Sequence, residues 1–164
     1  MKSNNIDIIL PFIKKSYVDI FEDFYNITNG DIILGGSLSL RLQGIIDRDI
    51  NDIDMNITIS DWNTYQSQIT KKYKIYYGST MRLHPMMEYI ISTCLSKQNN
   101  NIFHLFINNI ETNLYNTIVY NNVLIKVLKP ELHLLDKKCM ILDDLTNEKQ
   151  LLDIKSIETY LNEK

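Results

Sequence analysis

The hydrophobic and polar positions along the chain follow two periods, one typical of helices and one typical of strands. In the N-terminal part, apolar residues recur at helical spacing: Ile13, Tyr17, Ile20 and Phe24. Pro11 precedes them and suits the first turn of a helix. The pattern therefore predicts a first helix that ends near residue 26.

The middle of the chain carries mainly strand patterns. Short apolar or alternating runs predict strands at residues 31–36, 51–59, 74–78, 87–96 and 102–109, and a hairpin within residues 117–128. A short helix is expected at residues 37–43, because Ser37 suits its N-terminus and Gly44 its C-terminal end. A further helix is expected at residues 60–73, which start with Ser and Asp and end in basic residues.

Two amphipathic helices are predicted at the end of the chain. Residues 130–144 place four residues on one apolar side: Leu132, Leu135, Cys139 and Leu142. Residues 147–161 repeat the pattern with Ile154, Ile157 and Leu161. The element order predicts an α+β fold, a mixed β-sheet flanked by helices with a C-terminal helical pair. We expect one domain, with an N-terminal helix in 1–30, an αβ core in 31–128 and C-terminal helices in 129–164.

Composition narrows the class of protein. The 164 residues are 45% hydrophobic and 23% charged, which is typical of globular proteins in water. No run reaches the ~18 apolar residues of a membrane span, and the N-terminus lacks the pattern of a signal peptide, so a cytoplasmic protein is expected. Cys94 and Cys139 are far apart and are predicted to be reduced core residues. Few arginines beside many Asn, Ile and Lys are typical of AT-rich genomes, as in low-GC bacteria and their phages.

The charge distribution argues against a protein that only binds nucleic acid. The net charge is −3, which provides no general basic field. The run KKYKIYYG (71–78) holds a local group of lysines with three tyrosines and admits two interpretations. Its tyrosines stack bases, or they belong to the core or face of a sheet, which is the commoner role of alternating aromatic residues in a strand.

Two features close together in the sequence point to chemistry. Gly35, Gly36 and Ser37 stand where a predicted strand meets a predicted helix, and glycine lets a phosphate approach the backbone closely there. On the next predicted strand Asp52 and Asp54 are two residues apart, so both carboxylates are expected on one face. Like charges this close repel each other unless a cation lies between them. The two features together predict a phosphate site beside a Mg²⁺ site.

These residues resemble the signature of the nucleotidyltransferase superfamily, which includes polymerase-beta-like enzymes, small antibiotic and toxin nucleotidyltransferases, and abortive-infection toxins. The matching stretches are GGSLSLRLQG (35–44) and RDINDIDMNI (48–57), in which Arg48 precedes the acidic pair as in the toxin-like branch. The C-terminal part is similar to the same branch in a helix that starts with Pro and in several charged residues: Lys137 or Lys138, Lys149 and Asp153. The resemblance covers the chain from about residue 31 to its end.

The resemblance implies roles for these residues. Asp52 and Asp54 would bind Mg²⁺ or Mn²⁺, and the Gly35–Ser37 turn would hold the phosphates of an NTP. Arg48 is a candidate contact to the triphosphate; the alternative is a pair with Asp49 in the loop. Lys138, or its neighbour Lys137, is a candidate phosphate contact from the C-terminal helices; the alternative is a solvated lysine.

One departure from the family concerns its third carboxylate. Active members carry this acid on a neighbouring strand, and the matching position here is His104, in IFHLFINN. A neutral imidazole can accept a proton or bind a metal ion, but it brings no negative charge, and Mg²⁺ prefers oxygen ligands. Glu88 is a substitute if its strand lies alongside.

Two functions follow from the resemblance. The first is metal-dependent transfer of a nucleoside monophosphate from an NTP to an acceptor, with Asp52, Asp54 and His104 as the catalytic residues; the acceptor is an RNA, a protein or a small molecule. The second is an inactive nucleotidyltransferase-like module that serves in a toxin-antitoxin complex or a phage virion. The replaced acid and the phage-like composition favour the second.

Overall fold

The computed structural model describes the backbone of residues 9–84, 87–96 and 101–164 and the side chains of residues 9–78, 101–142 and 144–164. The strands are β1 (Ile33–Leu34), β2 (Asp54–Thr58), β3 (Tyr73–His84), β4 (Met87–Ser96), β5 (Ile102–Asn108), β6 (Tyr115–Tyr120) and β7 (Val123–Leu128). The helices are α1 (Lys15–Ile27), α2 (Gly36–Leu42), α3 (Ile59–Lys72), α4 (Pro130–Asp143) and α5 (Glu148–Asn162). The predicted α+β class, with its mixed sheet and C-terminal helical pair, is confirmed.

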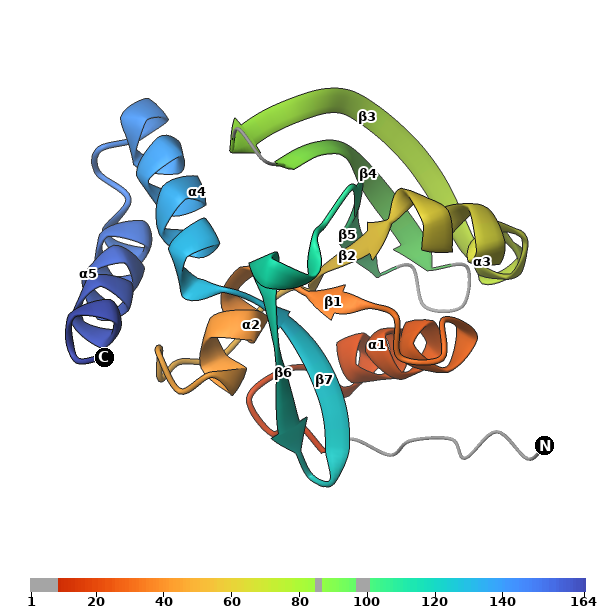
Figure 1. Cartoon of the computed structure of the whole chain (residues 1–164), viewed down its shortest axis with the longest axis horizontal. Coiled ribbons are helices and arrows are strands. Elements are labelled where there is room, and N and C mark those ends of the chain that lie inside the picture. Colours follow the sequence, from red (N-terminus) through yellow and green to blue (C-terminus); the bar gives the residue numbers. More distant parts are fainter. Residues whose placement is uncertain (1–8, 85–86, 97–100) are drawn as a thin grey trace.

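The described strands form one mixed sheet in the order β3-β4-β5-β2-β1-β7-β6 (Figure 1). β2 lies between β1, which is antiparallel to it, and β5, which is parallel to it. β3 continues to His84, beyond the strand predicted at residues 74–78, and arches with β4 toward α4. The central position of β2 brings residues from β1 and β5 to its two sides.

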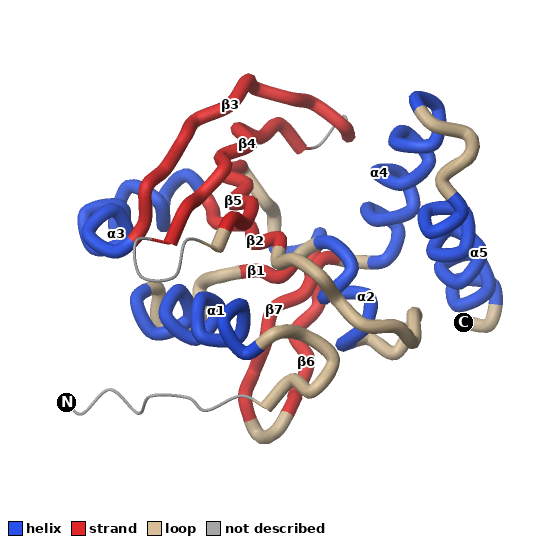
Figure 2. Tube along the Cα trace, turned by 180° about the vertical axis from the view of Figure 1, so that it is seen from behind, coloured by secondary structure: helices blue, strands red, loops and turns tan. Residues whose placement is uncertain are grey.

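The main core lies between one face of the sheet and the helices α1 and α3, which Figure 2 shows side by side. Phe24 of α1 is fully buried and contacts the rings of Tyr73 on β3 and Phe103 on β5. Trp62 and Ile69 of α3 are buried in the same cluster. The predicted stripe of the first helix therefore faces the core, but its first member, Ile13, lies before the helix, which begins at Lys15.

The opposite face of the sheet is covered only in part. A smaller apolar cluster includes Ile33, Ile110, Leu114, Leu128 and Leu132. It joins β1 and β7 to the first turn of α4. Because this cluster is small, polar side chains of β2 and β5 have room on the same face.

The C-terminal helices pack differently from the prediction. Leu132 is buried, but Leu135, Cys139 and Leu142 are exposed, Leu142 to 77%. The predicted apolar side of this helix is thus wrong in three of its four residues, and so is the expected core position of Cys139. α4 is oriented instead by polar contacts of its other side, described below. Cys94 has its side chain outside the described residues.

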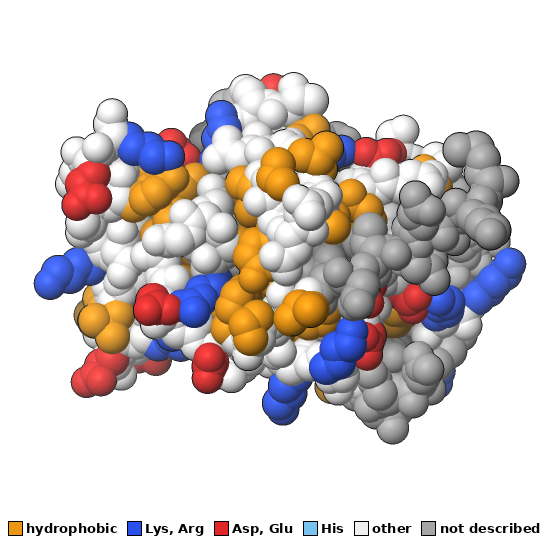
Figure 3. Space-filling model, turned by 90° about the horizontal axis from the view of Figure 1, so that it is seen from below, with side chains coloured by type: hydrophobic (Ala, Val, Ile, Leu, Met, Phe, Trp, Pro, Cys, Tyr) orange, Lys and Arg blue, Asp and Glu red, His pale blue; other side chains and the backbone are white. Residues whose placement is uncertain are grey.

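The β6–β7 hairpin lies at one edge of the sheet. Figure 3 views the molecule from this side and shows apolar side chains across the middle of the surface, with charged side chains both beside them and at the margin. Val119 and Leu124 of the hairpin are exposed to 70% and 60%. No helix within the described ranges is long and apolar enough to cross a lipid bilayer.

We predict that Phe24→Ala lowers the free energy of unfolding by about 3–5 kcal/mol, because it leaves a cavity between the rings of Tyr73 and Phe103. Urea denaturation followed by circular dichroism measures this change. Val119→Ala, at an exposed position, is the control and should change stability by less than about 0.5 kcal/mol. Equal effects of the two substitutions would contradict the assigned core.

Candidate functional site

The turn between β1 and α2 lies directly against β2. The backbone N–H of Gly35 donates to the carbonyl oxygen of Asp54 at 2.9 Å. Gly36 has φ +56°, and a Cβ atom built on it would lie 2.1 Å from Oδ2 of Asp54. No side chain fits between this backbone and the carboxylate, so the position requires glycine.

Asp54 also contacts the side chain that stands where the resemblance implies a third acid. Asp54 and His104 are paired in the parallel register of β2 and β5, and Nδ1 of His104 lies 3.2 Å from Oδ1 of Asp54. This hydrogen bond raises the pKa of His104 against the opposing effect of burial, and the charges of Asp54 and Asp52 raise it further. One carboxylate thus links the glycine turn to the imidazole.

Asp52 lies just before β2, which begins at Asp54, and its side chain is exposed. The negative charge of Asp52 contributes to the raised pKa of His104, so its carboxylate lies near enough to the Asp54–His104 pair to act on it. Glu88 is not next to His104, because the β4 residue paired with His104 is Thr93, five residues further along the strand. At ~3.3 Å per residue this separation is about 16 Å.

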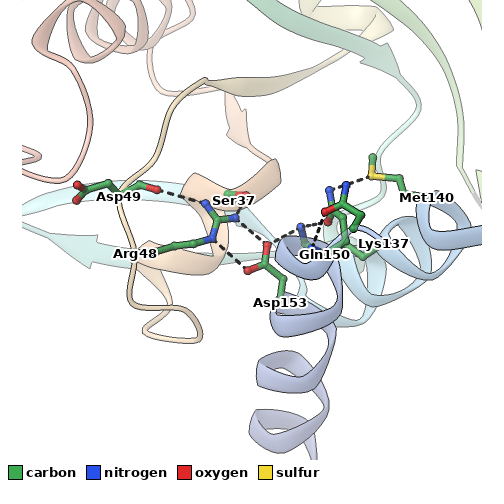
Figure 4. Close-up of polar contacts among 8 residues, drawn as sticks. Ser37, Arg48, Asp49, Lys137, Met140, Gln150 and Asp153 are labelled. Carbon is green, nitrogen blue, oxygen red and sulfur yellow. Dashed lines mark hydrogen bonds and ion pairs between the residues drawn. The ribbon is translucent and has the colours of Figure 1, made fainter. Parts of the chain in front are cut away.

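A buried ion pair joins the glycine turn to the C-terminal helices (Figure 4). The guanidinium of Arg48 donates to Oγ of Ser37 at 2.7 Å and to both carboxylate oxygens of Asp153 at 3.2 and 2.8 Å. The Asp153 side chain is only 3% exposed. Arg48 also donates to the backbone carbonyl of Asp49, so the expected loop contact is made through the backbone.

Lys137 provides a second cation for the same carboxylate. Its Nζ lies 2.8 Å from Oδ2 of Asp153 and donates to Oε1 of Gln150 at 2.8 Å (Figure 4). Burial alone would raise the pKa of Asp153, but hydrogen bonds from Arg48 and Lys137 lower it below its ordinary value. Lys138, the lysine chosen from the sequence, lies in an exposed pair with Glu158 at 2.7 Å. The structure therefore brings Lys137, and not Lys138, to this group.

The same side of α4 carries two more polar residues, His133 and Asp136. His133 lies three residues before Asp136 and four before Lys137, so the three side chains lie on one side of the helix. Nε2 of the buried His133 lies 3.0 Å from Oγ of Ser39 in α2. Burial, with the charge of Lys137, lowers the pKa of His133 to about 4. Burial raises the pKa of Asp136 to about 6, where the charge of Asp54 adds to the effect and Lys137 opposes it.

His133 and Asp136 are not among the site residues that the sequence predicts. The available signal was their spacing: together with Lys137 they form one polar stripe on a helix whose other side is apolar. An apolar stripe normally faces the core, so the pattern favoured the wrong side. Here His133 contacts α2 and Lys137 contacts α5.

The arrangement places negative and positive groups on different parts of one turn. Asp54 lies against Gly36, while Arg48 contacts Ser37. Within the described part of the chain, no group of three or more His, Cys, Asp or Glu side chains is placed to hold a metal ion by itself. Mg²⁺ commonly uses one or two carboxylates together with water and substrate phosphates, so Asp52 and Asp54 fit such a shared site.

We predict that Asp153→Asn lowers the free energy of unfolding by about 2–4 kcal/mol. Removing one partner of a buried pair costs about 3–5 kcal/mol, and Arg48 is partly exposed, which reduces the effect. Denaturant titration measures it. Glu158→Gln, which breaks the exposed pair with Lys138, is the control and should cost less than about 1 kcal/mol. If both variants are equally stable, Asp153 does not hold the helices to the turn.

Asp136→Asn should act in the opposite direction and stabilise the protein at pH 7 by up to about 3 kcal/mol. The pKa rises from 3.8 to about 6 on folding, so the charged carboxylate is disfavoured in the folded protein. The gain should be complete above pH 6 and vanish below pH 3.8, where the wild-type carboxyl is neutral in both states. Melting curves from pH 3.5 to 8 test this; a gain that does not change with pH would contradict it.

Comparison with known proteins supports the fold. No protein-family model and no curated protein sequence matches the chain. Among solved structures, a protein of Thermotoga maritima provisionally named a nucleotidyltransferase has a TM-score of 0.55 and 15% sequence identity, over 93% of this chain and 96% of that one. Two Helicobacter pylori structures, JHP933 and a provisionally named nucleotidyltransferase, have TM-scores of 0.39 and 0.40 and 14% identity. This chain spans 58% and 59% of their lengths, and their similarity is too low to support an argument. The glycine turn beside β2 thus belongs to a chain that shares its fold with the Thermotoga maritima protein provisionally named a nucleotidyltransferase.

Proposed function

We propose that this protein transfers a nucleoside monophosphate from an NTP to a hydroxyl group of an acceptor, with a divalent metal ion as cofactor. The observation that carries the proposal is the contact between Gly36 and Asp54. It places the backbone of the turn directly against a carboxylate, so closely that only glycine fits at residue 36. A phosphate held at this turn lies beside the carboxylate, and a metal ion between them relieves their repulsion.

Asp52 and Asp54 would hold Mg²⁺ or Mn²⁺ together with phosphate oxygens of the substrate. The bound ion would neutralise negative charge that builds up on the transferring phosphoryl group. Gly35, Gly36 and Ser37 would receive the β- and γ-phosphates. Arg48 supports this placement because its guanidinium already contacts Ser37.

Lys137 adds a second positive charge next to Arg48, and Asp153 balances one of the two. The remaining positive charge favours an anionic ligand at the turn. In this proposal Lys137 takes the role that the sequence suggested for Lys138.

The transfer step needs an attacking oxygen, a leaving group and a proton acceptor. The acceptor's hydroxyl oxygen bonds to the α-phosphorus, while the bond from that phosphorus to the oxygen bridging to the β-phosphate breaks. Pyrophosphate leaves with the electron pair. Because the pKa of His104 is raised, it can accept a proton only above that pKa, where the imidazole is neutral. In that form Nδ1–H would donate to Asp54, and Nε2 would keep a lone pair and take the hydroxyl proton.

The second candidate is an inactive module with this fold, as part of a toxin-antitoxin complex or a phage particle in a bacterial or infected cell. The observation that favours it is that His104, next to Asp54, stands where the resemblance implies a third acid. Among the described side chains, no three His, Cys, Asp or Glu residues are placed to bind one metal ion. A fold can persist after its chemistry is lost.

We predict that Mg²⁺ with an NTP raises the melting temperature. A ligand at one hundred times its Kd stabilises by ~2.7 kcal/mol, which is roughly 5–10 °C for a chain of this size. Asp54→Asn should remove the shift, and so should Gly36→Ala, whose Cβ would displace the Asp54 carboxylate. Gly44→Ala is the matched control: Gly44 also has positive φ, at +71°, but its Cβ would meet nothing within 4 Å.

The outcome separates the two candidates. If no NTP stabilises the wild-type protein at millimolar Mg²⁺ or Mn²⁺, the enzyme proposal fails and the inactive module remains. If an NTP binds, α-labelled NTP incubated with RNA, protein or aminoglycoside acceptors should give a labelled product that Asp52→Asn abolishes. Equal loss of binding in the Gly36 and Gly44 variants would show that backbone strain, and not contact with Asp54, causes the effect.

A further inference from the structure

One row of paired residues crosses the sheet from the site to its edge. His104 on β5 pairs with Asp54 on β2 and with Thr93 on β4, and Thr93 pairs with Tyr76 on β3. Directly paired residues point to the same side of a sheet. Tyr76 therefore lies on the face that carries Asp54 and His104, three strands away, which is ~14 Å at ~4.8 Å per strand.

Tyr76 presents a free aromatic surface on this face. Its side chain is 55% exposed, whereas its neighbours Tyr73 and Ile75 point to the opposite face and pack in the core. Lys74 is two residues from Tyr76, so it points to the same side, and it is exposed as well. At its β3 edge, the face that carries Asp54 and His104 thus presents an aromatic ring and a positive charge.

The direction of the transfer reaction connects this edge to the acceptor. In an in-line displacement the attacking oxygen enters opposite the leaving group. The pyrophosphate would leave on the side of Gly36, where β1 and α2 adjoin β2. The acceptor therefore enters from the other side of Asp54, and the strands on that side are β5, β4 and β3.

We propose that the acceptor is the end of a single-stranded nucleic acid, with a base stacked on Tyr76 and a phosphate next to Lys74. The terminal hydroxyl then lies at His104. Aromatic side chains stack on every base, and a lysine beside the ring binds the backbone, which is the usual chemistry of single-strand recognition. This inference rests on the proposed function, because it assigns the acceptor of that reaction.

The net charge of −3 fits a local site of this kind. A protein without a general basic field binds few phosphates, so its affinity depends only weakly on salt. Each phosphate contact on a single strand changes the slope of log K against log salt by ~0.7. A short contact through one ring and one lysine thus gives a shallow slope.

The test is fluorescence anisotropy of a labelled 12-nucleotide single-stranded RNA, and of the matching DNA, with EDTA and without NTP. Tyr76→Ala should weaken binding about 5- to 150-fold, the range for the loss of one stacked base, and Tyr76→Phe should keep it. Tyr77→Ala is the matched control. Tyr77 is 59% exposed on the same strand but contacts Trp62 on the opposite face, and its loss should leave binding unchanged. Lys74→Ala should reduce the salt slope by ~0.7.

Several outcomes would overturn the inference. They are no binding of either oligonucleotide, equal losses in the Tyr76 and Tyr77 variants, or transfer to a protein or aminoglycoside by an enzyme that does not bind RNA or DNA. If Tyr76→Ala removes the NTP-induced rise in melting temperature and leaves oligonucleotide binding intact, Tyr76 belongs to the nucleotide site instead. A different outcome would overturn the proposed function alone: the protein binds RNA through Tyr76, but no NTP raises its melting temperature.

Discussion

The contact between the backbone of Gly36 and the carboxylate of Asp54 determines how the site is built. A side chain at residue 36 would occupy the position of Oδ2, so the turn between β1 and α2 can lie this close to the Asp54 carboxylate only because residue 36 is glycine. The turn then fixes the start of α2 and the position of Ser37, to which Arg48 donates. The acidic and basic halves of the site thus meet at one backbone bend.

A single buried carboxylate connects this bend to the C-terminal helices. Asp153 balances Arg48 from the turn and Lys137 from α4, and each partner lowers the cost of burying the others. The buried His133 holds α4 to α2 at a second point. Polar contacts therefore orient the helical pair, and part of its apolar surface remains exposed. The cationic part of the site forms only when α4 and α5 are docked.

Sheet register decides which side chains share the face that carries Asp54 and His104. It pairs His104 with Asp54, and it places Thr93, not Glu88, beside His104. It also assigns Tyr76 and Tyr77, adjacent in a run of similar residues, to opposite faces. The sequence left both interpretations of that run open. Tyr73 belongs to the core, as the second interpretation predicts, while Tyr76 is exposed on the face that carries Asp54 and His104, and base stacking there stays a prediction.

The sequence by itself determined the order and type of the helices and strands, because periodicity, proline and glycine act locally. It also located the glycine turn and the two aspartates, since these lie within about 20 residues of one another. Only the tertiary structure decided the choice of Lys137 over Lys138, the buried side of α4 and the pairing of Arg48 with Asp153. Each of these depends on contacts between residues far apart in the chain, which the packing of whole helices establishes and no local pattern encodes.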